Sequence, residues 1–271
     1  MTLPVLFTSD KKRLREHFLK DPVLFAYHLG DLDDFFFRHC QWAVTYGYMP
    51  RVEECLLTYF GGDTPAVLAF GVTDSFPHLL ADMLDLLPER FHCHFFAPYR
   101  DLLRNRFTEQ PLGTYLKMRL ATYRPPQPQG DTQHIRRLTS DDAAELTALY
   151  TDAYPSNYFH PRMLQTGKYF GYIEDGHIVA AVGVHVYSTE FKVAALGNVA
   201  THPQARRRGL ATGLLAVLIE ELLAEDCLIC LNVAADNEAA ITCYERLGFE
   251  VTHRYEEARF SRSSPSAATV D

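Results

Sequence analysis

Residues 198–212 read NVATHPQARRRGLAT, and the interpretation of the chain starts from this stretch. The segment 191–200 is mostly small and apolar and includes two β-branched valines, which predicts a strand. Leucines recur at helical spacing over Leu210–Leu222, which predicts a helix. Pro203 ends the strand, and Gly209 lets the backbone approach a ligand closely. The stretch is therefore a strand, a basic turn and a helix.

The basic turn predicts an anion site. A helix that begins at such a turn points several unpaired backbone N–H groups at one place, with partial positive charge behind them. Arg206, Arg207 and Arg208 lie beside those donors, and a pyrophosphate fits this arrangement. A solvated basic turn before a capped helix is the alternative interpretation. The turn has neither a Gly-Lys-Ser/Thr ending nor a G-x-G-x-x-G pattern, which excludes the usual nucleotide-binding loops.

A second informative stretch follows one helix and one strand later. Residues 226–233 are predicted to form a buried strand, and residues 237–249 read NEAAITCYERLGF. On a helix, Ala240 and Tyr244 lie one turn apart on the same face, and Gly248 ends the helix. A core tyrosine with a satisfied hydroxyl is the alternative interpretation of Tyr244.

These two stretches resemble the signatures of the GNAT superfamily of acyl-CoA-dependent N-acyltransferases. The pyrophosphate signature, Arg/Gln-x-x-Gly-x-Gly/Ala, matches residues 206–211, after a Val-x-x-His-Pro strand ending at 199–203. The second signature, Asn-x-x-Ala-x-x-x-Tyr-x-x-x-Gly-Phe, matches residues 237–249 at every fixed position. Arg207 stands where many members carry a glycine.

The resemblance implies acetyl-CoA as the co-substrate. It assigns the pantetheine arm and the thioester carbonyl to the backbone at Val199 and Ala200, and the pyrophosphate to the backbone of 206–212. It gives Asn237 the task of anchoring the pantetheine or the following loop. The residues expected to bind the cofactor are Val199, Ala200, Thr201, Arg206, Arg207, Arg208, Gly209, Leu210, Ala211, Thr212, Asn232 and Asn237.

The resemblance also implies two catalytic residues. Tyr244 gives its proton to the leaving sulfur, since a phenol with a pKa of about 10 suits a thiolate of similar basicity. Many members carry a glutamate base in the strand before the turn, whereas segment 191–199 holds no carboxylate and has Asn198 instead. Asn198 is the candidate for holding a water that relays the amine proton. The alternative bases are Glu190, His185 and His202.

The region after the first helix of the C-terminal half lines the acceptor pocket in GNAT proteins. The residues expected to contact the acceptor are therefore Tyr154, Asn157, Tyr158 and Phe159. A hydrophobic plug between helices is the alternative interpretation of these side chains. The acceptor is expected to be an amine of a small molecule, an amino acid or a protein. A CoA-binding regulatory pseudoenzyme without turnover is the alternative function, and a simple phosphate or nucleic-acid contact is a third.

Segment 124–130, RPPQPQG, is the clearest domain boundary, because its prolines and glycine disfavour both helix and central strand. We predict a degenerate GNAT-like domain at 1–123, a Pro-rich linker at 124–131, a GNAT N-acetyltransferase domain at 132–260 and a disordered tail at 261–271. The fold class is α/β, with two GNAT-like mixed-sheet domains in tandem. In this layout the chain distantly resembles glycine N-acyltransferases.

Composition limits the partners. The formal net charge of -8 over 271 residues argues against nucleic-acid binding. No apolar run is long enough for a membrane span or a signal peptide, so we expect a cytoplasmic protein. Cys227 and Cys230 point to opposite faces of a strand, and His92 and His94 share a face without further ligands in view. We therefore expect no metal. The sequence leaves the oligomeric state open.

Overall fold

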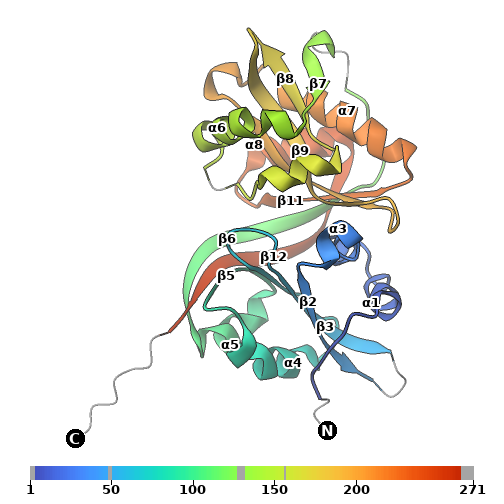
Figure 1. Cartoon of the computed structure of the whole chain (residues 1–271), viewed down its shortest axis with the longest axis vertical. Coiled ribbons are helices and arrows are strands. Elements are labelled where there is room, and N and C mark those ends of the chain that lie inside the picture. The colour runs from blue at the N-terminus through green and yellow to red at the C-terminus, as the bar shows by residue number, and fades with distance from the viewer. Residues whose placement is uncertain (1–3, 48–50, 127–131, 156, 264–271) are drawn as a thin grey trace, which may run out of the picture. The chain divides into compact units, whose positions relative to one another are not determined.

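The computed structural model describes residues 4–47, 51–126, 132–155 and 157–263. The chain forms two compact units, the first made of residues 1–20, 38–115 and 254–271 and the second of residues 21–37 and 116–253. Strands β6 (Phe107–Leu120) and β12 (Phe249–Arg262) each contribute to both units (Figure 1). Each unit therefore combines segments that are far apart in the sequence but pack against one another. The domain boundaries given by the proline-rich segment stay a prediction, because residues 127–131 lie outside the described residues.

The first unit is a mixed sheet with helices. Its strands follow the order β1-β2-β3-β4-β5-β12-β6, in which β4 and β5 are parallel. Phe91, Cys93 and Phe95 on one face of β5 join a buried apolar cluster with α4. The elements are β1 (Leu6–Phe7), α1 (Lys11–Phe18), β2 (Cys40–Tyr46), β3 (Val52–Tyr59), β4 (Ala66–Ala69), α4 (Phe76–Met83), η1 (Leu84–Leu86), β5 (Arg90–Phe95), η2 (Ala97–Tyr99) and α5 (Arg100–Arg104).

The second unit is also a mixed sheet, with the strand order β12-β6-β11-β10-β9-β8-β7. Strands β10 and β11 are parallel, whereas β7, β8, β9 and β10 pair antiparallel in succession. Its helices are α2 (Ala26–Asp31), α3 (Asp34–Phe37), η3 (Thr132–His134), η4 (Ser140–Asp142), α6 (Ala143–Ala153), η5 (Pro161–Thr166), η6 (Pro203–Ala205), α7 (Leu210–Ala224) and α8 (Glu238–Leu247). Its remaining strands are β7 (Ile135–Arg137), β8 (Phe170–Glu174), β9 (His177–Ser188), β10 (Val193–Thr201) and β11 (Leu228–Ala234). The predicted α/β class is confirmed.

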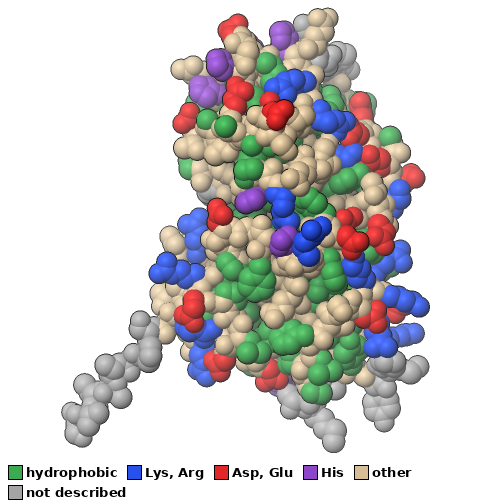
Figure 2. Space-filling view, viewed as in Figure 1, with side chains coloured by type: hydrophobic (Ala, Val, Ile, Leu, Met, Phe, Trp, Pro, Cys, Tyr) green, Lys and Arg blue, Asp and Glu red, His purple; other side chains and the backbone are tan. Residues whose placement is uncertain are grey.

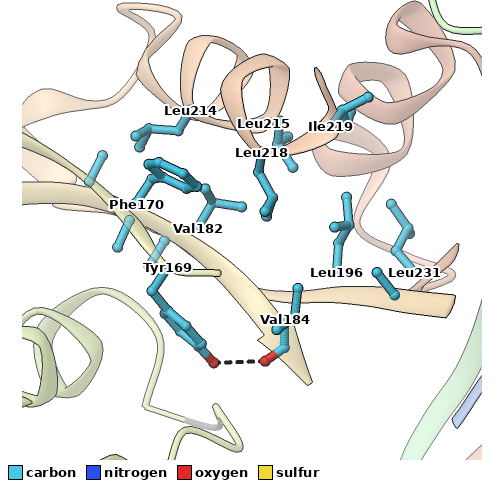
Figure 3. Close-up of a cluster of buried hydrophobic side chains, with 14 of the residues drawn as sticks. Tyr169, Phe170, Val182, Val184, Leu196, Leu214, Leu215, Leu218, Ile219 and Leu231 are labelled. Atoms are coloured by element: carbon cyan, nitrogen blue, oxygen red, sulfur yellow. Dashed lines mark hydrogen bonds between the residues drawn. The ribbon is translucent and has the colours of Figure 1, made fainter. Parts of the chain in front are cut away.

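Helix α7 covers the sheet of the second unit. Leu214 and Leu218, which its helical spacing brings to one face, lie over Val182 and Leu196 in Figure 3. All four side chains are fully or almost fully buried. Burial of each such side chain contributes roughly 1.5–3 kcal/mol, so this face holds the helix on the strands. The N-terminus of α7, where the basic turn lies, is thereby fixed beside the end of β10.

Helix α2 comes from the N-terminal part of the chain but packs in the second unit. Tyr27 contacts the ring of His185 on β9, with centroids 6.0 Å apart. Gly30 lies so close to β9 that a Cβ atom there would be 2.7 Å from Val186. The sequence does not reveal this packing, because a local pattern can identify a buried face without identifying what covers it.

Strand β12 reaches further than the sequence suggests. Ser261 and Arg262, which the sequence assigns to a disordered tail, lie in this strand. Ser261 pairs with Arg90, and the Arg262 side chain donates to the carbonyl of Leu87 at 2.7 Å and to Glu89 at 2.8 Å. These contacts fix the end of the strand, which a small and polar composition does not reveal. Residues 264–271 lie outside the described residues.

The face of the molecule in Figure 2 has no large region in which all charged side chains carry the same sign. Over the face in Figure 2, Lys and Arg side chains are interspersed with Asp and Glu, in line with the net charge of -8. Among the described residues, no helix combines the length and apolar character that crossing a bilayer requires.

Candidate functional site

Strands β10 and β11 separate part of the way along their length. They pair in parallel from Val193–Leu196 against Leu228–Leu231, and among the described residues the pairing ends there. Both strands continue, β10 to Thr201 and β11 to Ala234. The backbone groups of the unpaired ends can hydrogen-bond an extended ligand laid between them. Val199, Ala200, Thr201 and Asn232, which the sequence assigns to the cofactor, all lie on these unpaired ends.

A bulge marks the start of the opening. Gly197 pairs with Gly183 on β9 and Ala200 pairs with Ala181, so β10 carries one extra residue between them. Asn198 has a φ of 52°, the left-handed conformation that a bulge can require of a non-glycine residue. Bulges turn side chains and backbone groups away from the regular ladder. The bulge therefore gives Asn198 an orientation that a regular strand would not.

The basic turn has the geometry of an anion site. Arg207 has a φ of 65° and Gly209 a φ of 78°, and α7 begins at Leu210 immediately after them. The first N–H groups of a helix have no partner within it. The turn and the first turn of α7 contain the predicted residues Arg206, Arg207, Arg208, Gly209, Leu210, Ala211 and Thr212, whose contact with a cofactor stays a prediction. The Thr212 hydroxyl contacts the Cys243 thiol of α8 at 3.3 Å.

Two of the three arginines in the turn are held by the protein itself. Arg208 binds both carboxylate oxygens of Glu174, at 2.9 and 2.7 Å. Arg206 donates to the carbonyls of Thr201 at 3.2 Å and Ala153 at 3.3 Å. These two side chains brace the turn, and Arg206 ties it to the end of α6. Arg207 is exposed. The role of the backbone N–H groups and of Arg207 in binding an anion stays a prediction.

Asn198 is built into a buried polar network. Tyr169 donates its hydroxyl proton to the carbonyl of Val184 at 2.9 Å (Figure 3), so that hydroxyl accepts from Asn198 Nδ2, also at 2.9 Å. Tyr150 donates to the backbone carbonyl of Asn198 at 2.7 Å. Together these bonds fix which way the Asn198 amide faces. Its Oδ1 is buried and has no hydrogen-bond partner among the described residues.

The unsatisfied Oδ1 is the most informative atom of the site. A buried acceptor without a partner costs roughly 1–3 kcal/mol, and such groups are rare in folded proteins. Asn198 is only 2% exposed, so bulk water does not satisfy this oxygen. This oxygen is therefore an acceptor for a donor that enters the site. The sequence singles out Asn198, but neither Tyr169 nor Tyr150 carries a sequence signal for this role.

Tyr244 lies on α8 as predicted. Asn237 is the N-cap of α8, with its Oδ1 accepting from the Ala240 N–H at 3.2 Å, and Gly248 ends the helix at a φ of 99°. Burial raises the pKa of the Tyr244 phenol, so the group stays protonated at any physiological pH. Cys243 and Tyr154 also raise the pKa of Tyr244, by less than burial does. Asn237 thus has a structural task in addition to any cofactor contact.

The four predicted acceptor residues follow α6. Phe159 packs against the rings of Tyr150 and Tyr169, with centroids 5.1 and 5.7 Å away, beside the Asn198 network. The Asn157 side chain closes the local loop, donating to the carbonyl of Tyr154 at 2.7 Å and accepting from the Phe159 N–H at 2.8 Å. Tyr154 is exposed, whereas Tyr158 packs at the edge of the apolar core. The acceptor assignment stays a prediction, with Tyr154 as its most accessible member.

The alternative bases differ in position. Glu190 precedes β10, at the end opposite Asn198, with about 3.3 Å of strand per residue between them. The His202 Nδ1 accepts from the Gln204 N–H at 3.4 Å and so caps a short helical turn. The His185 ring lies over Gly197, where a Cβ atom would be 1.8 Å from it. Of the three, Glu190 lies before the paired part of β10, whereas the His185 ring lies beside Gly197 at the start of the opening.

A lysine that the sequence analysis did not select also reaches the open strands. Lys117 on β6 is 1% exposed and donates to Asn232 Oδ1 at 3.2 Å. Asn232 Nδ2 is buried and has no hydrogen-bond partner among the described residues. The bond from Lys117 therefore leaves this N–H group directed away from the lysine and available to a ligand carbonyl. A single lysine in a strand belongs to no sequence pattern from which this contact could be predicted.

Comparison with known proteins identifies the family of this site. Residues 135–249 match the Acetyltransferase (GNAT) family. These residues form a GNAT domain. Proteins of this family use acyl-CoA, and the open strands, the basic turn and Tyr244 all lie within the matched segment. The predicted superfamily is confirmed, while the closer resemblance to glycine N-acyltransferases stays a prediction.

Solved structures show the same fold over almost the whole chain. A Drosophila protein has a TM-score of 0.73 at 17% identity, covering 96% of this chain and 98% of its own. A tandem GNAT protein from the clavulanic acid biosynthesis pathway has a TM-score of 0.58 at 15% identity, covering 97% and 99%. A GNAT-family protein from Novosphingobium aromaticivorans has a TM-score of 0.61 at 23% identity, covering 77% and 89%. The predicted tandem GNAT architecture is confirmed.

Proposed function

We propose that the GNAT domain transfers an acetyl group from acetyl-CoA to an amine of a small molecule, an amino acid or a protein, by direct attack in a ternary complex. The observation that carries the proposal is the unpaired end of β10, which joins the anion-binding turn at one side and the unsatisfied Asn198 Oδ1 at the other. These features lie on one continuous segment of about fifteen residues. They provide a site for the pyrophosphate, one for the acyl arm and one for a proton-bearing nitrogen.

The cofactor lies along this segment. The pyrophosphate accepts the N–H groups at the start of α7, where the helix dipole adds to their attraction. The pantetheine amides pair with the free backbone of Val199 and Ala200, and the Asn232 Nδ2 donates to a carbonyl from the opposite strand. The arrangement holds the thioester in a fixed position. Fixing the two reacting groups in this way provides most of the rate gain that comes from orientation.

The reaction forms one bond and breaks one. The amine nitrogen attacks the thioester carbon, a C–N bond forms, and the C–S bond of acetyl-CoA breaks. Asn198 Oδ1 accepts a hydrogen bond from the amine, or from a water that takes its proton, and so orients the nitrogen lone pair. Tyr244, which burial keeps protonated, gives its proton to the leaving sulfur. The proton that the amine loses passes through the water held by Asn198 and restores the Tyr244 phenol, so that the protein is unchanged after one turnover. A positioned acid of this kind contributes about 10²–10⁴-fold.

The first test is calorimetric titration of the full chain with acetyl-CoA. We expect one site with micromolar or better affinity. A panel of amines is then screened by release of free CoA thiol, with Tyr244→Phe expected to lose 10²–10⁴-fold in kcat at unchanged acetyl-CoA affinity. Tyr172→Phe, which removes a hydroxyl elsewhere in the same domain, is the control.

Three results would contradict the proposal. Absence of acetyl-CoA binding removes the cofactor assignment. Full turnover by Tyr244→Phe removes the acid role. Tight binding without thiol release across the whole panel favours a CoA-binding regulator that does no chemistry.

A further inference from the structure

The first unit holds a second group of polar side chains that the GNAT site does not use. His92 and His94 alternate along β5 with Phe91, Cys93 and Phe95, which face the apolar core. The two imidazoles therefore share the other face of the strand. Because β12 pairs antiparallel with β5, it sets Glu257 directly opposite His94. A histidine pair that is incomplete in the sequence thus gains a carboxylate 163 or more positions away.

The three side chains converge on one point. Glu257 Oε2 lies 3.0 Å from His92 Nε2, and Glu257 Oε1 lies 3.4 Å from His94 Nε2. One ligand atom from each residue lies within 4.8 Å of the other two. Zinc–ligand bonds of about 2.0–2.1 Å in a tetrahedral site place neighbouring ligand atoms roughly 3.3 Å apart. Only small side-chain movements separate the present arrangement from a coordination sphere.

The surroundings prepare these groups as ligands. Tyr255 donates its hydroxyl to Glu257 Oε1 at 2.7 Å, and its ring stacks on His94 with centroids 5.3 Å apart. Such second contacts orient metal ligands and raise affinity. The imidazoles of His92 and His94 are 19% and 13% exposed and leave a path from solvent, whereas the Glu257 side chain is 7% exposed.

We propose that His92, His94 and Glu257 bind a divalent transition metal ion of the Zn²⁺ class, with the remaining position open to water. Two imidazoles and one carboxylate suit Zn²⁺ and its first-row neighbours, whereas Ca²⁺ and Mg²⁺ require more oxygen ligands. The ion links β5 to β12, two strands far apart in the chain, and therefore stabilises the first unit. It is bound independently of acetyl-CoA.

The test is titration of the EDTA-treated full chain with ZnCl₂, followed by calorimetry. We expect one site of micromolar or better affinity, weakened roughly 100-fold or more by His94→Gln or Glu257→Gln. His78→Gln, which removes an exposed histidine of α4, is the matched control and should leave the affinity unchanged. CoCl₂ should give the visible spectrum of a tetrahedral nitrogen–oxygen site, without the strong near-ultraviolet absorption of a Co–thiolate bond.

A stability readout separates binding from mere ion pairing. The single tryptophan, Trp42, lies in the first unit, so its fluorescence follows the unfolding of that unit. Zn²⁺ should raise the unfolding midpoint of the wild type and not that of Glu257→Gln. If a ligand variant does not fold, Tyr255→Phe keeps all three ligands and should bind about 10- to 100-fold more weakly. Three results overturn the proposal and leave a histidine–carboxylate ion pair. They are a Zn²⁺ affinity that survives these substitutions, thiolate absorption with cobalt, and the absence of binding at 100-fold excess of Zn²⁺ over protein.

Discussion

Replacing Tyr169 with phenylalanine should destabilise the GNAT domain by about 2–4 kcal/mol. The substitution removes one buried hydroxyl and leaves the Val184 carbonyl and the Asn198 Nδ2 without that partner. Each buried polar group left unsatisfied costs roughly 1–3 kcal/mol. Two such groups sum to about 2–6 kcal/mol, and the weak contact that the Asn198 amide keeps to the Met163 sulfur at 3.7 Å places the expected value in the lower half of that range. This is a large share of the 5–15 kcal/mol that folded domains typically have.

Amide hydrogen exchange read by mass spectrometry is the appropriate assay, because Trp42 lies in the other unit and its fluorescence does not report on this domain. Peptides from β8–β10 should exchange about 30- to 700-fold faster in Tyr169→Phe, since 1.4 kcal/mol corresponds to a factor of ten. Tyr172→Phe is the matched control. It lies on β8, three positions after Tyr169, is 9% exposed, and its hydroxyl makes no hydrogen bond within the described residues. Acceleration below about tenfold, or equal acceleration in the control, would refute the network as a stabilising element.

Two further predictions concern single residues. Arg207→Gly and Arg207→Ala lose the same charge, but only glycine relieves the φ of 65°, which costs a non-glycine residue about 1–2 kcal/mol. Glycine also gives the unfolded chain more conformational entropy, which offsets part of this gain. The glycine variant should therefore be about 0.5–1 kcal/mol more stable than the alanine variant, measured by hydrogen exchange, and both should bind acetyl-CoA equally. A more stable alanine variant would show that the turn is unstrained. Burial, reinforced by Lys20, lowers the pKa of His17 from 6.5 to about 4. The unfolded chain therefore takes up this proton at a higher pH than the folded one, and the first unit should lose up to about 3 kcal/mol between pH 7 and pH 4, measured by Trp42 fluorescence. His17→Asn does not titrate and should flatten this dependence; an unchanged profile would assign it to other groups.

The sequence predicts those parts of the site that are local in the chain. The turn at Arg206–Gly209 and the helix that carries Tyr244 are each encoded within about fifteen residues, by glycine positions and hydrophobic spacing. The structure places both as predicted. Asn198 is also visible in the sequence, as a polar residue of a segment, 191–199, that holds no carboxylate.

The orientation of Asn198 could not be predicted in this way. It depends on Tyr150 and Tyr169, which lie 48 and 29 positions earlier in the chain. No short-range pattern links a tyrosine to an amide at such a distance, because the contact exists only after β8, β9 and β10 have paired in register. The same holds for Lys117 and Asn232, which are 115 positions apart.

The two candidate sites differ in how a sequence can reveal them, and the difference is physical. An anion bound by backbone N–H groups requires a particular run of backbone conformations, so it leaves a contiguous trace such as a glycine after a basic turn. A metal bound by side chains requires only that three atoms meet, and β-sheet pairing can bring them from any two strands. The spacing of His92 and His94, two residues apart, shows in the sequence that they share a face of a strand. The strand register that brings Glu257 to them is set by apolar residues on the opposite face. There, three residues of β5 pack with two of β12: Phe91, Cys93 and Phe95 with Ala258 and Phe260. A one-residue slip in that register would turn Glu257 to the apolar face and bury its charge without a partner. The packing of the apolar core thus determines that the carboxylate meets the two imidazoles.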